Sequence, residues 1–459
     1  MSSITGDFIA SNKISVEKYL LDEHLEVYLK TKTRSAVSVC IDYIYGLILL
    51  PKRKNMSKMA IYCCKCSNNQ SLSHFISNST WSSADLLKSV RTKAIEIIGE
   101  DGVIILDESG MRKSGNFSVG VSHQYCGNLG KIDNCQVGVF LAYFKGEKRI
   151  LIDERLYLPE KWVNDEERCL KAQIPYEEIV FRTKYDLGLE MIDNAIKECI
   201  PFSYVTMDGF YGENPILLTE LENRGLTFVA DIAIDTKVYV QEPIVGIPGK
   251  KGKRGRQPTI PRVLNLFSIR VDSLSSSIEG WELIRIRKTE RGYKEVYFKA
   301  IKVWRLKAIK VWRRQDELPC ENPLWLLISK DAKSGEIKHS FCNASENASF
   351  DELAKMQSSR YWVERAFQDA KGYCGMAEYM VRSWNAWHHH MTLVMLTMLI
   401  LLSYKIKFIK FHKTSLHGVI LIMKFHNPLK ILNAEELAKI LNHDNDMRER
   451  ARASRLKSS

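Results

Sequence analysis

The sequence lacks the signals that direct a protein out of the cell or into a membrane. Residues 1–10 include Asp7 and have no cationic start followed by an apolar core, unlike a secretory signal. The most apolar run, residues 391–404, is about 14 residues long, short of the roughly 20 that span a bilayer. We therefore expect a cytoplasmic protein with no membrane partner, in which this run forms a buried helix.

Disulfide and phosphate-loop signals are also missing. The 11 cysteines are an odd number scattered over 459 residues, unlike the dense framework of a small secreted domain, so we expect reduced thiols. The closely spaced Cys63, Cys64 and Cys66 have no second pair at the spacing of a zinc site. No Gly-Lys-Ser or Gly-Lys-Thr follows a strand in the glycine-rich stretch 246–261, which excludes a phosphate loop there.

Positive charge is present in excess. The chain has 67 Lys and Arg against 54 Asp and Glu, a net charge of +13, and it is 45% hydrophobic and 10% aromatic. This composition can bury a core, which excludes a disordered protein. The charge favours a polyanionic partner, either nucleic acid or an anionic membrane surface.

Periodicity predicts a helical N-terminal region followed by an α/β core. Apolar residues recur at helical spacing over 83–98. Two short apolar runs, 103–106 and 204–207, each stop at an aspartate, as in a buried strand with a carboxylate at its exit. Further strands are expected at 135–144, 149–156 and 227–232, and helices at 186–199 and 214–223. This order predicts an open mixed sheet.

The pattern changes after residue 246. A flexible segment there carries five cations, Lys250, Lys251, Lys253, Arg254 and Arg256. Strand-like stretches follow at 281–287, 293–305 and 324–329, which predicts a β-rich insertion. Within it, Lys-Ala-Ile-Lys-Val-Trp-Arg occurs twice, at 299–305 and 307–313. We interpret this repeat as a tandem duplication that either lengthens a hairpin or damages the fold.

Three acidic residues are candidates for a shared metal site. A long helix is predicted over 351–373, and it places Arg360, Glu364 and Lys371 on one face. Glu364 together with Asp107 and Asp208 would offer oxygen ligands to hard divalent cations, which support in-line attack on phosphorus. Three other carboxylates are rivals. Successive residues of a strand point to opposite faces, so Asp107 and Glu108 cannot both enter one site. Asp153, which lies in a hairpin, and Asp369, which lies around the helix from Glu364, are weaker candidates.

Three separated blocks of the sequence carry a resemblance to a known family. The first block begins Leu106-Asp-Glu-Ser-Gly-Met-Arg-Lys-Ser-Gly115 and continues to residue 139. The second is Met207-Asp-Gly-Phe-Tyr-Gly212, and the third is the stretch 360–371 with Val381-Arg-Ser-Trp384 and His390-Met-Thr-Leu393. In this order the blocks resemble those of the bacterial IS701-type DDE transposases, which are relatives of the IS4 group, and the resemblance covers most of the chain.

The resemblance implies an α/β, RNase H-like mixed-sheet core with Asp107, Asp208 and Glu364 as its acidic triad. The IS4-type signature has Tyr three residues before its Arg, where this chain has Gln357 before Arg360. The implied domains are a helical DNA-binding domain at 1–98, the first part of the core at 99–235, a basic and β-rich insertion at 236–350, the second part of the core with the catalytic helix at 351–404, and a basic helical region at 405–459.

The function that the resemblance implies is DNA transposition. Such a protein binds the inverted ends of an insertion sequence, cleaves them and joins them to target DNA. It uses Mg²⁺, with Mn²⁺ able to substitute and two ions per site, and it acts as a homodimer or larger assembly on double-stranded DNA in the bacterial nucleoid. The expected DNA contacts are Arg360, Lys371, Lys250, Lys251, Lys253, Arg254 and Arg256.

Two alternatives stay open at this point. One is a catalytically inactive protein that still binds the ends, a decayed copy or an inhibitor, which the duplication and Gln357 keep in view. The other is a metal-dependent repair nuclease, which should cut DNA without specific ends.

Trp304, Trp312 and Trp325 either stack on a displaced base or pack within the insertion.

Overall fold

The structure is a computed structural model of the chain, and it describes residues 5–31, 34–65, 67–250, 257–289, 292–307, 318–409 and 414–456. Several predicted features therefore lie outside the described residues. They are Cys66, the four cations Lys251, Lys253, Arg254 and Arg256, and most of the second repeat copy with Trp312.

The N-terminal part is helical, as the periodicity predicts. Its helices are α1 Gly6–Ser11, α2 Val16–Asp22, α3 Val37–Leu49, α4 Met56–Tyr62, α5 Asn69–Ser77 and α6 Ser83–Ile98. The last coincides with the predicted helix and begins after Ser82, whose side chain accepts a hydrogen bond from the Asp85 amide. Its buried face, which includes Leu86, Val90 and Ala94, packs against the core.

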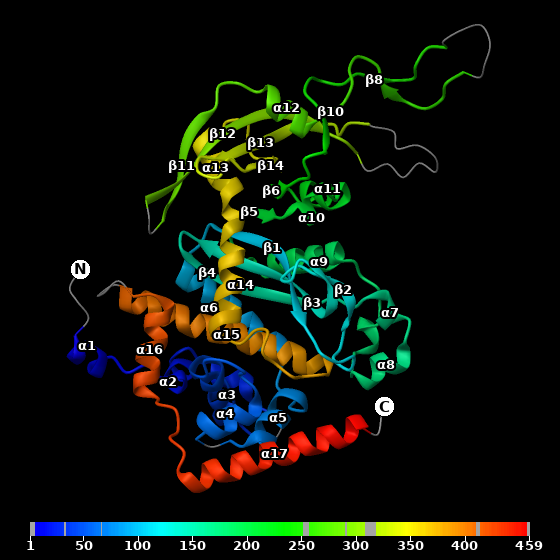
Figure 1. Cartoon of the computed structure of the whole chain (residues 1–459). Helices are drawn as coiled ribbons and strands as arrows, with labels where there is room; N and C mark the ends of the chain where they lie inside the picture. The colour runs from blue at the N-terminus through cyan, green and yellow to red at the C-terminus, as the bar shows by residue number, and fades with distance from the viewer. Residues whose placement is uncertain are drawn as a thin grey trace.

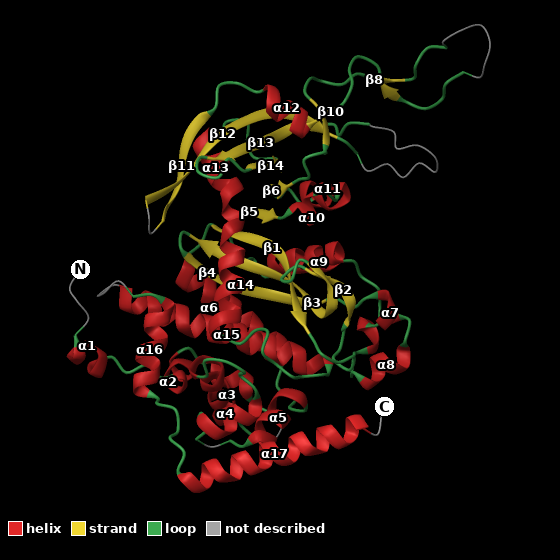
Figure 2. Ribbon diagram, in the orientation of Figure 1, coloured by secondary structure: helices red, strands yellow, loops and turns green. Residues whose placement is uncertain are grey.

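A mixed sheet forms the core, as Figure 2 shows. The strands β1 Gly102–Arg112, β2 Ser122–Cys126, β3 Lys131–Lys145 and β4 Lys148–Leu156 pair antiparallel with one another. On its other side β1 pairs parallel with β5 Phe202–Met207, which pairs parallel with β6 Phe228–Asp231. Between them lie α7 Glu160–Val163, α8 Glu166–Lys171, α9 Lys184–Lys197, α10 Gly209–Gly212 and α11 Pro215–Asn223. The strand order β4-β3-β1-β5-β6 confirms the predicted RNase H-like α/β core.

The first strand is longer than its apolar run suggests. The prediction that it ends at Asp107 is wrong, because β1 continues to Arg112. The reason is that β1 has two partners: its pairing with β5 stops at Leu106 and Met207, whereas its pairing with the long β3 extends to Arg112 and Cys135. Asp107 therefore lies where the parallel pairing ends, in the middle of a strand.

The insertion is β-rich, as predicted, and it extends the core sheet. It contains β7 Lys237–Tyr239, β8 Val245–Gly246, β9 Arg262–Val263, β10 Ile269–Arg270, α12 Val271–Ser277, β11 Glu282–Thr289, β12 Gly292–Arg305, β13 Leu324–Asp331 and β14 Ile337–Cys342. Strand β14 is absent from the sequence-based prediction; it pairs antiparallel with β6 and so joins the insertion to the core. Figure 1 shows these strands above the core. The boundaries at residues 235 and 350 stay a prediction.

The predicted long helix at 351–373 is two helices. They are α13 Phe350–Gln357 and α14 Tyr361–Tyr373, joined by a 3₁₀ turn at Ser358–Arg360. Serine side chains compete for backbone hydrogen bonds, and the Ser359 hydroxyl donates to the Met356 carbonyl at 2.6 Å, which accounts for the break. In Figure 1, α14 runs from the insertion down to the core.

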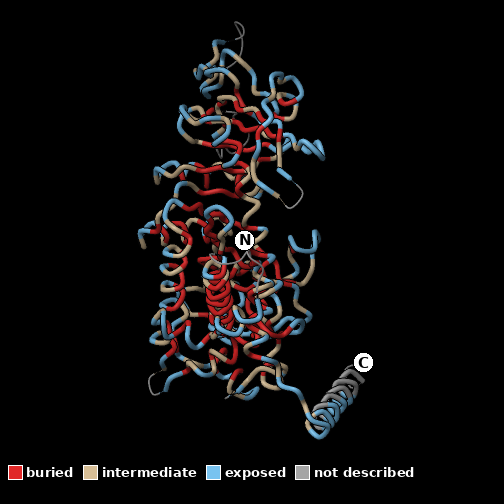
Figure 3. Tube along the Cα trace, turned by 90° about the vertical axis from the view of Figure 1, so that its left-hand side faces the viewer, coloured by how far each residue is buried: buried red, intermediate tan, exposed pale blue. Residues whose placement is uncertain are grey.

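The apolar run near the C-terminus belongs to a long core helix, α15 Trp384–Ile409, followed by α16 Leu416–His426 and α17 Ala434–Leu456. Among the described residues, α15 is the one helix long and apolar enough to cross a membrane, but 72% of its apolar window is buried inside the protein. Buried residues gather in the middle of the protein, and α17 stands apart from it (Figure 3). We interpret α15 as the buried core helix that the sequence predicts.

Gly212 allows α10 to approach the end of β6. A Cβ atom at this position would lie 1.9 Å from the Asp231 carbonyl oxygen. Gly212→Ala should therefore lower the free energy of unfolding by about 2 kcal/mol or more, measured by urea unfolding. Gly209→Ala is the matched control, since its nearest neighbours lie at 3.9 Å, and it should change stability little. Equal stability of the two variants would contradict this account.

Candidate active site

Three neighbouring parallel strands lead to aspartates at the same level of the sheet. Leu106 pairs with Met207, and Met207 pairs with Ala230. The next residue on each strand is therefore Asp107, Asp208 or Asp231. Adjacent strands are about 4.8 Å apart, so this register brings the three carboxylates together. We call them the acidic row.

Asp107 is the more deeply buried of the two aspartates that the sequence predicts as ligands. Its residue is 9% exposed, and its Oδ1 accepts a hydrogen bond from the Glu108 amide at 2.7 Å. Burial and the neighbouring Asp208 raise the pKa of Asp107 to about 7, although Arg360 acts in the opposite direction. This carboxylate is thus destabilised in its ionised form unless a cation approaches.

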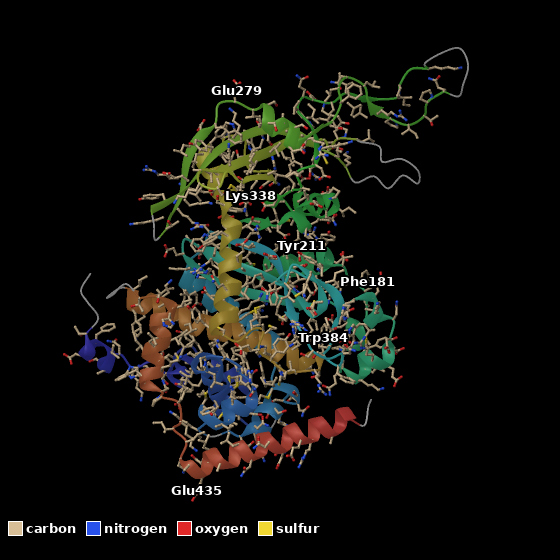
Figure 4. The ribbon with its side chains drawn as sticks, in the orientation of Figure 1. Phe181, Tyr211, Glu279, Lys338, Trp384 and Glu435 are labelled. Carbon is tan, nitrogen blue, oxygen red and sulfur yellow. The ribbon has the colours of Figure 1, made fainter. Side chains whose placement is uncertain are left out.

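Asp208 begins α10, and its Oδ1 accepts a hydrogen bond from the Tyr211 amide at 3.3 Å. Burial raises the pKa of Asp208, while the Tyr211 amide and Arg360 lower it. The Tyr211 ring is buried beside Asp107 and Asp208, and its hydroxyl has no hydrogen-bond partner in the described part of the chain. Figure 4 labels Tyr211 between the core sheet and the insertion.

Glu364 lies on α14 and is linked to the acidic row through Arg360. Its side chain is 55% exposed, and its Oε1 accepts a hydrogen bond from Arg360 Nη2 at 2.8 Å. Glu364 lines two clefts. One of about 150 Å³ also contains Asp231 and Arg360, and the other, of about 620 Å³, also contains Glu108 and Lys371.

Arg360 lies among the carboxylates. Its Nε is 3.2 Å from Asp231 Oδ2, its Nη1 is 3.8 Å from Asp107 Oδ2, and its Nη2 contacts Glu364. Burial opposes the positive charge, but Asp231, Glu364 and Asp107 outweigh it and raise the pKa of the guanidinium. Arg360 thus supplies the positive charge that keeps these carboxylates together.

Two of the three rival carboxylates are paired away from the acidic row, whereas Glu108 lines the larger cleft together with Glu364. Glu108 Oε1 forms an ion pair with Lys184 Nζ at 2.7 Å. Asp153 pairs with Arg91 at 3.2 Å, and Asp369 pairs with Arg149 at 2.5 Å. Because buried ion pairs of this kind satisfy their carboxylates, Asp153 and Asp369 are structural residues here.

The other predicted contacts lie around the clefts or away from them. Lys371 Nζ contacts Asn128 Oδ1 at 3.3 Å, across the larger cleft, and Lys250 is exposed in the insertion. The Gln357 side chain is buried toward the insertion strands. Trp304 and Trp325 are half-buried on those strands, and Trp325 donates to the Ser345 carbonyl at 3.2 Å.

Asp231 is the member of the acidic row that the sequence-based prediction leaves out. The sequence signal was the same as for Asp107 and Asp208, since a strand is predicted over 227–232 and Asp231 lies at its end. Burial raises the pKa of Asp231, while a hydrogen bond from Ser340 and the charge of Arg360 lower it. Asp231 lies outside the three blocks that carry the family resemblance.

Oxygen donors fit a hard divalent cation at this site. In the part of the chain that the structure describes, however, no three His, Cys, Asp or Glu side chains are placed to hold a metal ion. The physical reason lies in Arg360, which occupies the space between Asp107 and Glu364. Release of Glu364 from Arg360 would free its carboxylate for a cation.

Known proteins support a nucleic-acid enzyme. The family described as "DDE superfamily endonuclease" matches residues 24–277, which include Asp107 and Asp208. The "Probable transposase for insertion sequence element IS701" from Microchaete diplosiphon is 29% identical over 203 residues, 43% of this chain and 48% of that protein. The alignment thus spans about half of the length of that relative.

Two solved structures match the chain at low identity. A piggyBac transposase synaptic complex with hairpin DNA is 10% identical, with a TM-score of 0.39 over 92% of this chain and 78% of that one. The NurA nuclease from Sulfolobus solfataricus is 11% identical, with a TM-score of 0.27 over 62% of this chain and 86% of that one.

The raised pKa of Asp107 predicts a pH-dependent stability. Because an unfolded aspartate titrates near about 4 and the folded one at about 7, its contribution to stability is present below about pH 4 and lost as pH rises through 7. Without divalent cations, Asp107→Asn should therefore gain on the order of 1 kcal/mol or more over wild type between pH 5 and 8. Urea unfolding in chelator would measure this, and a pH-independent difference would contradict it.

Proposed function

The chain belongs to the DDE superfamily endonucleases, and on this premise we propose that it is a DNA transposase. In this proposal it binds the inverted ends of an insertion sequence, cleaves them and joins them to target DNA by in-line attack on phosphodiesters. The observation that carries the proposal is the acidic row opposite Glu364, since the register of β1 and β5 aligns Asp107 with Asp208.

Asp107, Asp208 and Glu364 are the proposed ligands of two Mg²⁺ ions, with Mn²⁺ able to substitute. When bound, such ions lower the pKa of an attacking water and stabilise charge on the phosphate oxygens. The protein's own side chains would position the phosphate and supply positive charge beside it. Arg360 and Lys371 flank Glu364 and can each donate hydrogen bonds to a phosphate. Glu108 lines the same cleft as Glu364, but its Oε1 is paired with Lys184, so we do not include it among the proposed ligands.

Double-stranded transposon ends and target DNA are the proposed partners, and the net charge of +13 supports a polyanionic ligand. Residues 250–256 would contact phosphates, because five cations among glycines suit backbone contacts better than base reading. Cleavage at paired ends calls for a homodimer or larger assembly on the DNA. An inactive end-binding protein would share every DNA contact but would not cut.

Substitution of the triad tests the chemistry. Asp208→Asn and Glu364→Gln should each reduce Mg²⁺-dependent nicking of end DNA by about a thousandfold or more, because each removes a ligand worth several kcal/mol in the transition state. End binding should remain, since the phosphate contacts lie on other residues.

Glu108→Gln is the matched control for the triad, because Glu108 is a neighbouring carboxylate with a lysine partner. It should retain appreciable nicking. Nicking by Asp208→Asn at the wild-type rate would refute the assignment. Wild-type protein that binds the ends and never nicks them would favour the inactive alternative, and nicking of any duplex at the same rate would favour a repair nuclease.

Neutralising the basic segment tests the DNA path. Replacing Lys250, Lys251, Lys253, Arg254 and Arg256 with Gln should weaken binding to any duplex. The slope of log affinity against log salt should fall by roughly 0.9 for each DNA phosphate that the variant no longer neutralises. Electrophoretic binding at several salt concentrations measures both effects. An unchanged slope would place the segment away from DNA, and a loss confined to the end sequence would mean that it reads bases.

A further inference from the structure

The third carboxylate of the acidic row is held from the insertion. Ser340 of β14 lies directly opposite Asp231 in the pairing of β14 with β6. Its hydroxyl donates to Asp231 Oδ1 at 2.6 Å, while Asp231 Oδ2 faces Arg360 Nε at 3.2 Å. The two oxygens thus have different partners, one from the insertion and one at the active site.

Gln357 orients the serine. Its Nε2 donates to the Ser340 hydroxyl at 3.0 Å and to the Leu327 carbonyl at 3.2 Å, and both Gln357 and Ser340 are buried. Because the hydroxyl accepts from Gln357, its single proton is directed to Asp231. A continuous series of contacts therefore runs from β13 to Arg360: hydrogen bonds join β13, Gln357, Ser340 and Asp231, and an ion pair joins Asp231 to Arg360.

The Arg360 guanidinium contacts both Asp231, which we call the anchor, and the proposed metal ligands. Nε faces Asp231, whereas Nη1 and Nη2 face Asp107 and Glu364. The fork of an arginine is rigid, so one edge can stay in place while the other is released. Without the Asp231 contact, Asp107 and Glu364 would be the carboxylates nearest to this charge, in competition with an incoming cation.

We propose that Asp231 is a positioning residue: it holds Arg360 Nε so that Asp107 and Glu364 can exchange the guanidinium for divalent cations while Arg360 stays beside the site. This inference rests on the proposed function. Gln357, which lines the smaller cleft at the position where the IS4-type signature carries tyrosine, then has a structural role, since its amide nitrogen supports Ser340.

A double-mutant cycle on Mn²⁺ binding tests the proposal. Calorimetry would measure binding to the full-length, DNA-free wild type, Asp231→Asn, Arg360→Gln and the double variant. Asp231→Asn should weaken Mn²⁺ binding at least roughly threefold when Arg360 is present, within the range of coupling between contacting residues. In the Arg360→Gln background the same substitution should change binding by less than about twofold.

Two further variants separate positioning from general effects. Ser340→Ala should weaken Mn²⁺ binding in the same Arg360-dependent way, because it frees the anchor without removing a charge. Glu336→Gln is the matched control: it removes a carboxylate that lines the same cleft but pairs with Lys338, at 3.9 Å. It should leave Mn²⁺ binding unchanged. Thermal unfolding of each variant checks that the fold persists.

Cleavage kinetics give a second measurement. Asp231→Asn should raise the Mg²⁺ concentration for half-maximal nicking at least roughly threefold while the rate at saturating Mg²⁺ stays near wild type.

Equal weakening of Mn²⁺ binding in both backgrounds would overturn the proposal, because Asp231 would then act through its charge alone. Unchanged binding in both backgrounds would overturn it too. Wild type that binds Mn²⁺ but never nicks end DNA would refute the proposed function, while the binding cycle would still decide the role of Asp231.

Discussion

The register of three parallel strands is the constraint on which the site depends. It places Asp107, Asp208 and Asp231 side by side in a largely buried setting, where like charges repel and burial already disfavours ionisation. Positive charge must therefore lie nearby for the ionised row to persist. Arg360 meets this need from the turn before α14, and the break between α13 and α14 sets where that turn lies.

The insertion is part of the same constraint. Because β14 pairs with β6, the insertion is part of the core sheet, and its Ser340 contacts the acidic row. Gly212 of α10 also lies against this end of β6. Only a residue without a Cβ atom allows α10 to approach the Asp231 backbone so closely. The sheet, the short helix and the insertion thus converge on one strand end.

Much of this architecture follows from local pattern. Helix α6 and strands β4, β5 and β6 lie close to their predicted bounds, and the strand-then-aspartate signal locates Asp107 and Asp208. The partners of these residues are harder to predict, because Ser340 lies 109 residues from Asp231 along the chain. A six-residue strand such as β14, with Lys338, His339 and Ser340 in its middle, carries too weak a pattern to reveal such a pairing.

The tandem repeat lies close in sequence to the strands that support the acidic row. Its first copy forms the end of β12, where the pairing with β13 runs out at Val303 and Leu324. The second copy follows β12 along the chain, and most of it lies outside the described residues. The pairings that bring Ser340 to the acidic row, β13 with β14 and β14 with β6, are present after the repeat. The strand pairing that holds Asp231 is thus present in a chain that carries the duplication.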